Sequence, residues 1–283
     1  MIERPVPFVK MSGSGNDFIL VDNRARLIDP ETAGPWIKAV CRRALSVGAD
    51  GVILLQEDPQ GEADFAWRFF NNDGGEAEMC GNGGRCAARL AFDLGLAGRE
   101  MRFRTRVGLI RGWVLEGREV RVQLTAPRDY RPSVKLEFPD RELKVAHVDT
   151  GVPHAVLVVD DIEQVAVKEL GRAIRYHPVF APRGANADFV QIHDHHQVSI
   201  RTYERGVEDE TLACGTGAAA TAVALAYAGL IQPPLRLTTR GGDVLTVNFQ
   251  GAHGEIRDLT LQGPVRYVAR GEIDPEAWIS ANL

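Results

Sequence analysis

The sequence is poor in the features that mark several protein classes. Only four of its 283 residues are cysteines, and no CxxC pair occurs among them. In a reducing compartment, thiols spread this thinly favour neither a disulfide framework nor a structural zinc site. No run approaches the roughly 18 apolar residues that a membrane-spanning helix needs. A formal net charge of -5 argues against nucleic acid or an anionic membrane as a partner.

The chain also lacks an obvious targeting segment. Its first residues, MIERPVPFVKMSGSG, contain no apolar core of a signal peptide, so we expect a cytoplasmic protein. A composition of 45% hydrophobic and 25% charged residues is typical of a soluble globular protein. The length suits two domains of ordinary size.

Two halves of the chain repeat the same motifs in the same order and at nearly the same separation. This pattern predicts an internal duplication with a domain-sized period. We place the domains at 1–127, with 265–283 returning to the first, and at 128–264. The boundary falls in the proline-rich and charged segment 125–135. The paired motifs are GSGNDFILVDN (13–23) with TGVPHAVLVVDD (150–161), GADGVILL (48–55) with GANADFVQI (184–192), and RFFNNDGGEAEMCGNG (68–83) with RTYERGVEDETLACGTG (201–217).

Each half predicts an α+β fold. Short β-rich runs separated by tight turns favour a mainly antiparallel sheet. The run AAATAVALAYAGL after Cys214 is apolar all round, which indicates a buried helix. We therefore expect two pseudo-symmetric domains, each a sheet curled around a central helix, with the active site in the cleft between them. Helices are also expected over 31–45 and 162–177, and a strand with one solvent-facing side over 102–112.

Cys80 and Cys214 each directly precede a Gly-x-Gly at the start of a predicted helix. The positive end of a helix stabilises a thiolate, so we expect a lowered pKa for both thiols. The amides of the next residues can hold a carboxylate. Two such thiols, on opposite sides of one carbon, could remove a proton from one face and deliver another to the opposite face. No phosphate loop with a Schiff-base lysine is evident, so no pyridoxal phosphate, other cofactor or metal is expected.

These motifs resemble the diaminopimelate epimerase family over essentially the whole chain. The resemblance rests on GSGNDF (13–18), GADG (48–51), FNNDGGEAEMCGNGGRC (70–86), TGVPH (150–154), GANADFVQI (184–192) and YERGVEDETLACGTGAA (203–219). It implies a cofactor-independent isomerase that interconverts LL- and meso-diaminopimelate on the route to lysine and peptidoglycan. The substrate is then a small amino acid, and a homodimer is a further expectation.

The resemblance also assigns roles to residues. Cys80 and Cys214 match the catalytic thiols, and His154 and Glu204 match residues near the reacting amine. The backbone that grips the reacting carboxylate matches Gly81, Asn82, Gly215 and Thr216. Residues that hold the distal end of the substrate match Asn16, Asn71, Asn186 and Arg205. One departure is Val152, where family members with GNPH use an asparagine on the distal group.

Other readings of the same residues stay open. The asparagines lie beside Gly and Asp, as turn residues do, and Glu204 and Arg205 could form a surface pair. We expect His193, His195 and His196 to lie in a solvated loop, and Cys41 (in the 31–45 helix) and Cys86 to be packing residues. The alternative functions are a racemase of another amino acid, such as histidine, lysine or proline, that uses the same thiols, and a non-catalytic amino-acid-binding protein.

Overall fold

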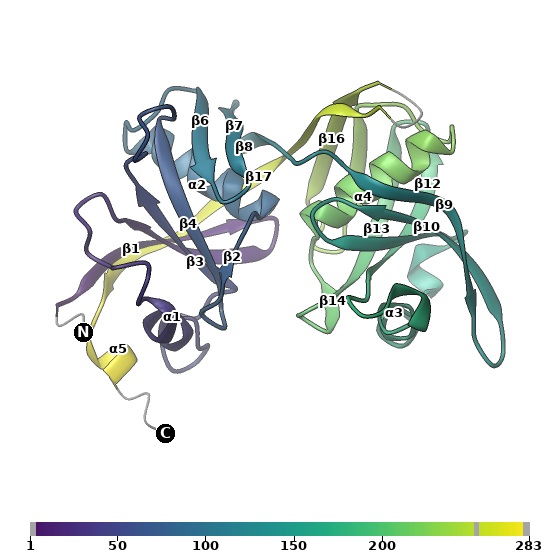
Figure 1. The fold of residues 1–283 in the computed structure, drawn as a ribbon, viewed down its shortest axis with the longest axis horizontal. Coiled ribbons are helices and arrows are strands. Elements are labelled where there is room, and N and C mark those ends of the chain that lie inside the picture. Colours follow the sequence, from purple (N-terminus) through teal and green to yellow (C-terminus); the bar gives the residue numbers. More distant parts are fainter. Residues whose placement is uncertain (1–3, 252–254, 280–283) are drawn as a thin grey trace. The chain divides into compact units, whose positions relative to one another are not determined.

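The computed structural model describes residues 4–251 and 255–279. Within these residues the chain forms two compact units: 4–122 together with 264–279, and 123–263 without 252–254. Each unit is rich in β-sheet and has few helices (Figure 1). None of the helices in the described ranges has the length and apolar character that crossing a bilayer requires.

In the first unit, eight strands pair in a closed barrel among the described residues. Their order around the ring is β17, β1, β2, β3, β4, β6, β7, β8 and back to β17. Most neighbours are antiparallel, whereas β2 with β3 and β4 with β6 are parallel. The elements are β1 (Val6–Gly13), β2 (Asn16–Asp22), α1 (Gly34–Val40), β3 (Gly51–Gln56), β4 (Phe65–Asn71), β5 (Glu76–Ala77), α2 (Gly81–Asp93), β6 (Glu100–Thr105), β7 (Gly108–Val114), β8 (Glu119–Gln123) and α5 (Glu276–Ile279).

The second unit pairs its described strands in the order β9, β10, β11, β12, β13, β15, β16 and β17. From β10 to β16 the strand directions alternate as they do from β1 to β7 in the first unit. The elements are β9 (Arg128–Glu137), β10 (Glu142–Asp149), β11 (Pro153–Val158), η1 (Ile162–Gln164), α3 (Val167–Arg175), η2 (Pro178–Phe180), β12 (Asn186–Asp194), β13 (Gln197–Glu204), β14 (Asp209–Thr211), α4 (Gly215–Tyr227), β15 (Leu235–Thr239) and β16 (Val244–Gln250).

The long strand β17 (Arg257–Ile273) contributes to both units. Its first part pairs with β16, with Gln262 opposite Thr246. Its second part pairs with β1, with Val265 opposite Gly13 and Ile273 opposite Val6. The first described strand of the chain, β1, and the last, β17, therefore lie side by side.

The helices α2 and α4 both follow a cysteine and are both largely buried. Helix α2 contacts β1, β2, β3, β4 and β7, and α4 contacts β9, β10, β11, β12 and β16. Alanine and glycine fill most of the sequence of α4, so strands can approach it from several sides. The prediction that the run after Cys214 forms a buried helix is confirmed.

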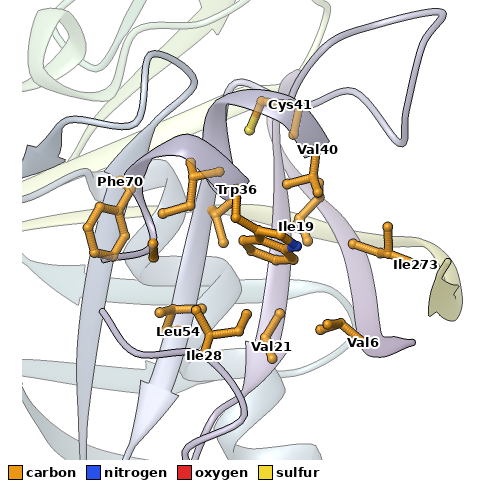
Figure 2. Packing of buried hydrophobic residues seen from close by; sticks show 14 residues of the cluster. Val6, Ile19, Val21, Ile28, Trp36, Val40, Cys41, Leu54, Phe70 and Ile273 are labelled. Atoms are coloured by element: carbon orange, nitrogen blue, oxygen red, sulfur yellow. The ribbon is translucent and has the colours of Figure 1, made fainter. Parts of the chain in front are cut away.

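Helix α1 packs on the outer side of the first sheet. Figure 2 shows Trp36 of α1 among Ile19, Val21 and Leu54, which come from β2 and β3. The helix predicted over 31–45 is shorter than expected and ends at Val40. The prediction that Cys41 lies inside this helix is therefore wrong, because Cys41 is its C-cap residue. Its side chain is buried in the same cluster.

Three further expectations differ in detail from the structure. The segment 102–112 is not one strand but the hairpin of β6 and β7, because residues 106 and 107 form the turn between them. The helix predicted over 162–177 is divided into η1 and α3. Most of the segment 125–135, in which the domain boundary was predicted, forms the start of strand β9, despite its prolines.

Candidate active site

Cys80 is the N-cap residue of α2. Its backbone is extended, with φ of -145° and ψ of 118°, and its Sγ accepts a hydrogen bond from the backbone N–H of Gly83 at 3.4 Å. Gly81 and Asn82 form the first turn of the helix and are buried. The first turn of a helix presents backbone N–H groups without intrahelical partners, which suits it to bind a carboxylate.

Asn16 lies against this cysteine. The Cys80 Sγ is 3.7 Å from Asn16 Oδ1, which also accepts a bond from Asn82 Nδ2 at 3.4 Å. The other end of the Asn16 amide donates to Asp50 Oδ2 at 2.7 Å, and Arg43 Nη2 donates to Asp50 Oδ1 at 3.0 Å. The structure thus brings three of the predicted residues together and fixes the orientation of the Asn16 amide.

Cys214 is the N-cap residue of α4 and has the same local geometry. Its Sγ accepts from the backbone N–H of Gly217 at 3.4 Å and lies 3.4 Å from Thr216 Oγ1. The Thr216 carbonyl accepts a bond from Thr150 Oγ1 at 3.0 Å, which ties the first turn of α4 to the end of β10. The prediction that both cysteines stand at helix starts is confirmed.

The expected lowering of the thiol pKa is wrong for Cys214. Its side chain is buried, and this burial raises the pKa of the thiol well above its ordinary value. The carboxylates of Glu204 and Asp188 raise the same pKa further, while hydrogen bonds from Thr216 and the Gly217 N–H lower it. Burial and two nearby anions therefore outweigh the two hydrogen bonds that the start of α4 makes to this thiol.

His154 and Asp188 form a buried pair between the parallel strands β11 and β12. His154 Nδ1 lies 2.7 Å from Asp188 Oδ2, and both side chains are 0% exposed. The second carboxylate oxygen of Asp188 accepts from Thr202 Oγ1 at 2.8 Å. Since each oxygen of a buried carboxylate has a donor, the group can remain there without an unsatisfied polar atom.

Asn186 connects this pair to Arg205. Its Oδ1 accepts the backbone N–H of Arg205 at 2.7 Å, and its Nδ2 lies 3.3 Å from His154 Nε2. The Arg205 guanidinium is half-buried and donates to the Arg183 carbonyl at 3.3 Å. Burial lowers the pKa of Arg205, as do the positive charges of Arg183 and Arg175. These neighbouring positive charges would favour the binding of a carboxylate beside Arg205.

The remaining predicted residues are placed as follows. Glu204 ends β13, and its charge acts on Cys214. Asn71 is exposed at the end of β4, and its side chain makes no hydrogen bond within the described part of the chain. Val152 is half-buried, and its carbonyl accepts the backbone N–H of Thr150 at 3.2 Å. A surface pocket of about 530 Å³ beside Tyr176 and His177 is lined by none of these residues.

Sequence comparison gives the family directly. A family model described as diaminopimelate epimerase matches residues 8–128 and 146–267. The chain belongs to the diaminopimelate epimerase family. A diaminopimelate epimerase of Aquifex aeolicus is 44% identical over 278 residues, which cover 95% of this chain and 98% of that relative. One from a Hydrogenobaculum species is 39% identical over 94% of this chain and 98% of its own length.

Solved structures of other proteins share the fold of this family member. A probable proline racemase from Agrobacterium radiobacter matches with a TM-score of 0.72 at 17% identity, over 96% of this chain and 95% of that one. A hydroxyproline epimerase from Agrobacterium vitis has the same TM-score at 16% identity, over 97% and 95% of the two chains. At these identities the likeness concerns the fold alone.

Three buried residues of this epimerase-family chain received no role from the sequence. Asp188 and Thr202 stand beneath the first turn of α4, and Arg85 of α2 is 0% exposed. Arg85 donates to Ser14 Oγ at 3.1 Å and to the Gly81 carbonyl at 3.4 Å, so it ties the β1–β2 turn to the helix start. A charged residue within the apolar run ADFVQI could have indicated Asp188, because a strand face that is otherwise apolar needs a partner for it.

The histidine-rich turn has local partners. His193 Nε2 lies 2.8 Å from Ser199 Oγ, His195 Nδ1 lies 3.0 Å from the Leu230 carbonyl, and His196 Nδ1 lies 3.1 Å from the Gln232 carbonyl. All three imidazoles are thus used in holding the turn between β12 and β13. No set of three metal-binding side chains occurs among the residues that the structure describes. Cys86 is 0% exposed in α2, as expected for a packing residue.

Proposed function

We propose that this chain interconverts LL- and meso-diaminopimelate by a two-base mechanism in which Cys80 and Cys214 are the acid–base groups. The observation that carries this proposal is that both thiols are N-caps of buried, glycine-rich helix starts. Membership of the diaminopimelate epimerase family supports it. The reaction belongs to the synthesis of lysine and of peptidoglycan precursors.

In the forward step, one cysteine acts as a thiolate and takes the α-proton. The electron pair of the broken C–H bond moves toward the carboxylate, and the other cysteine gives its thiol proton to the opposite face of the same carbon. The first thiol ends protonated and the second ends as a thiolate, so the reverse reaction uses the opposite pair of states. Acid–base groups in such positions typically contribute a factor of about 10² to 10⁴ in rate.

The two helix starts also stabilise the charge that grows on the carboxylate. We assign this role to the backbone of Gly81 and Asn82 in α2 and of Gly215 and Thr216 in α4. Backbone N–H groups and the positive ends of helix dipoles stabilise this negative charge more in the transition state than in the substrate. No cofactor is required for this scheme, because the two thiols and the two helix ends supply each of its parts.

The remaining site residues would bind the two amino-acid groups of the substrate. We assign His154 and Glu204 to the reacting amine, and the distal group to Asn16, Asn71, Asn186 and Arg205. Support for Arg205 comes from its half-buried guanidinium with Arg183 and Arg175 nearby. Val152 offers no side-chain hydrogen bond, so the distal group would be held without the asparagine that other family members use there.

We further propose that the two units derive from one duplicated domain, with boundaries near 1–127 and 265–283 for the first and 128–264 for the second. The matching order of strand directions, and the buried helix that each unit carries after a cysteine, support this origin. A cytoplasmic location and a homodimer remain part of the proposal.

Deuterium uptake tests the proposal. In D₂O the wild-type chain should incorporate deuterium at the α-carbon of LL-diaminopimelate and form the meso isomer. Cys80→Ala and Cys214→Ala should each lower the epimerisation rate at least about a hundredfold, since neither thiol can act on both faces. Cys86→Ala, in the same helix as Cys80, is the matched control and should remain active. Wild-type epimerisation by either alanine variant, or equal rates on lysine or histidine, would overturn the assignment.

A further inference from the structure

The third residue of both helices is a glycine, but different groups face it in the two units. A Cβ on Gly83 of α2 would lie 3.1 Å from Ile53 Cδ1 and 3.5 Å from Phe18 Cζ. A Cβ on Gly217 of α4 would lie 2.4 Å from Asp188 Oδ1. The space beneath one helix start is thus filled by hydrocarbon, and the equivalent space beneath the other by a carboxylate.

The hydrogen bonds around His154 fix its protonated nitrogen. A backbone N–H can only donate, so the bond from Arg205 N to Asn186 Oδ1 orients the Asn186 amide. Its NH₂ group then faces His154 Nε2 at 3.3 Å, and this nitrogen must accept. The imidazole proton therefore lies on Nδ1 and is donated to Asp188 at 2.7 Å.

We propose that Asp188 is a positioning residue for the reaction: it holds His154 in the Nδ1–H tautomer and keeps a negative charge beneath Cys214, so that Cys214 retains its proton in the substrate-free protein. The inference rests on the proposed function, in which Cys214 is one of the two acid–base thiols.

The surroundings of Cys214 support this assignment. The charged or titratable groups that bear on it are Glu204 from β13 and Asp188 from β12, and His154 from β11 is held against Asp188. Burial raises the pKa of the Cys214 thiol, and both carboxylates raise it further. Beneath α2, the corresponding contacts of Gly83 are with the apolar side chains Ile53 and Phe18.

Thiol alkylation of the substrate-free chain tests the charge. Iodoacetamide modification at a series of pH values, followed by peptide mapping, gives the reaction rate of each cysteine. The wild-type rate for Cys214 should rise at a higher pH than that for Cys80. Asp188→Asn should speed alkylation of Cys214 at pH 8 on the order of tenfold, which corresponds to about one pKa unit, and leave Cys80 unchanged.

The matched control is Asp161→Asn, which removes the same charge from an exposed residue of the second unit that caps η1. It should change the alkylation of neither thiol. An unchanged Cys214 rate in folded Asp188→Asn would overturn the inference. The inference would also be overturned if, in the wild-type chain, alkylation of Cys80 began at a higher pH than alkylation of Cys214. This second measurement does not depend on the folding of a variant.

Nitrogen-15 NMR of the histidine rings tests the tautomer on the wild-type chain. The His154 signals should show a protonated Nδ1 and an unprotonated Nε2, and the opposite tautomer would overturn the inference. Neither experiment uses substrate or turnover. A failure of the wild-type chain to act on diaminopimelate would therefore refute the proposed function alone, whereas the thiol and imidazole measurements bear on Asp188 alone.

Discussion

Replacing Gly217 by alanine adds one methyl group at the start of α4, where Asp188 leaves no room for it. The new Cβ would lie 2.4 Å from Asp188 Oδ1, about 1 Å closer than an ordinary contact. Asp188 cannot yield freely, because its two oxygens are held by His154 at 2.7 Å and by Thr202 at 2.8 Å. We expect the substitution to break or lengthen one of these bonds.

The magnitude follows from two opposing terms. Losing a buried hydrogen bond to a charged group costs about 1.5–3 kcal/mol. Replacing glycine by alanine within a helix returns up to about 1 kcal/mol. With the full return for alanine, the net loss in the free energy of unfolding should be about 0.5–2 kcal/mol. Displacement of Asp188 would also move His154, so the epimerisation rate should fall at least about tenfold.

Urea denaturation followed by circular dichroism measures the stability term, and conversion of LL-diaminopimelate measures the rate. Gly83→Ala is the matched control for stability. There the new methyl would meet the end of the Ile53 side chain at 3.1 Å, and a rotation of that side chain can relieve the contact. It should remain within about 1 kcal/mol of the wild type. A Gly217→Ala chain as stable and as active as the wild type would refute the reasoning.

Two further predictions concern the substrate and pH. Arg205→Met should lower kcat/KM for diaminopimelate, with a loss of transition-state stabilisation of about 2 kcal/mol. This value is at the low end of the range for truncated buried charge pairs, because Arg205 is half-buried. The slow rate with lysine, which lacks the distal carboxylate, should not change; a parallel loss with lysine would contradict the assignment. Burial raises the pKa of Cys41 and Cys86 to about 12 from 9.0 and also raises that of Cys214. The folded state favours the protonated thiols, so the free energy of unfolding is unaffected by these groups below pH 9. Above pH 9 the free energy of unfolding should fall by about 1.4 kcal/mol per pH unit for each thiol. Urea unfolding between pH 7 and 10.5 checks this, and Cys86→Ala should flatten the decline.

The sequence predicts those parts of the site that local signals encode. A cysteine before Gly-x-Gly and an alanine-rich run marks a helix start, and the structure has Cys80 and Cys214 as N-caps. Strand positions also follow from short β-branched and aromatic runs, as in β3 and β4. These features depend on neighbours within a few residues, which is why one chain suffices to predict them.

Contacts between distant strands could not be predicted in this way. The pairing of His154 with Asp188 depends on the register of the parallel strands β11 and β12, and parallel register leaves no local sequence signal. The raised pKa of Cys214 likewise depends on its burial and on Asp188 and Glu204. The early end of α1 reflects the turn that follows, in which Ala44 has φ of 67°.

The closure of the first barrel by β17 bears on how the chain folds during synthesis. Strand β1 pairs with residues 265–273, so two partners separated by most of the chain must meet. Residues 123–263, by contrast, form a unit that is continuous in sequence. Until residues 265–273 have been made, β1 can pair with β2 along one edge only. Because long-range pairing is slow, the other edge of β1 should stay unpaired until β17 reaches it, and a chaperone that binds unpaired strand edges would act there in that interval.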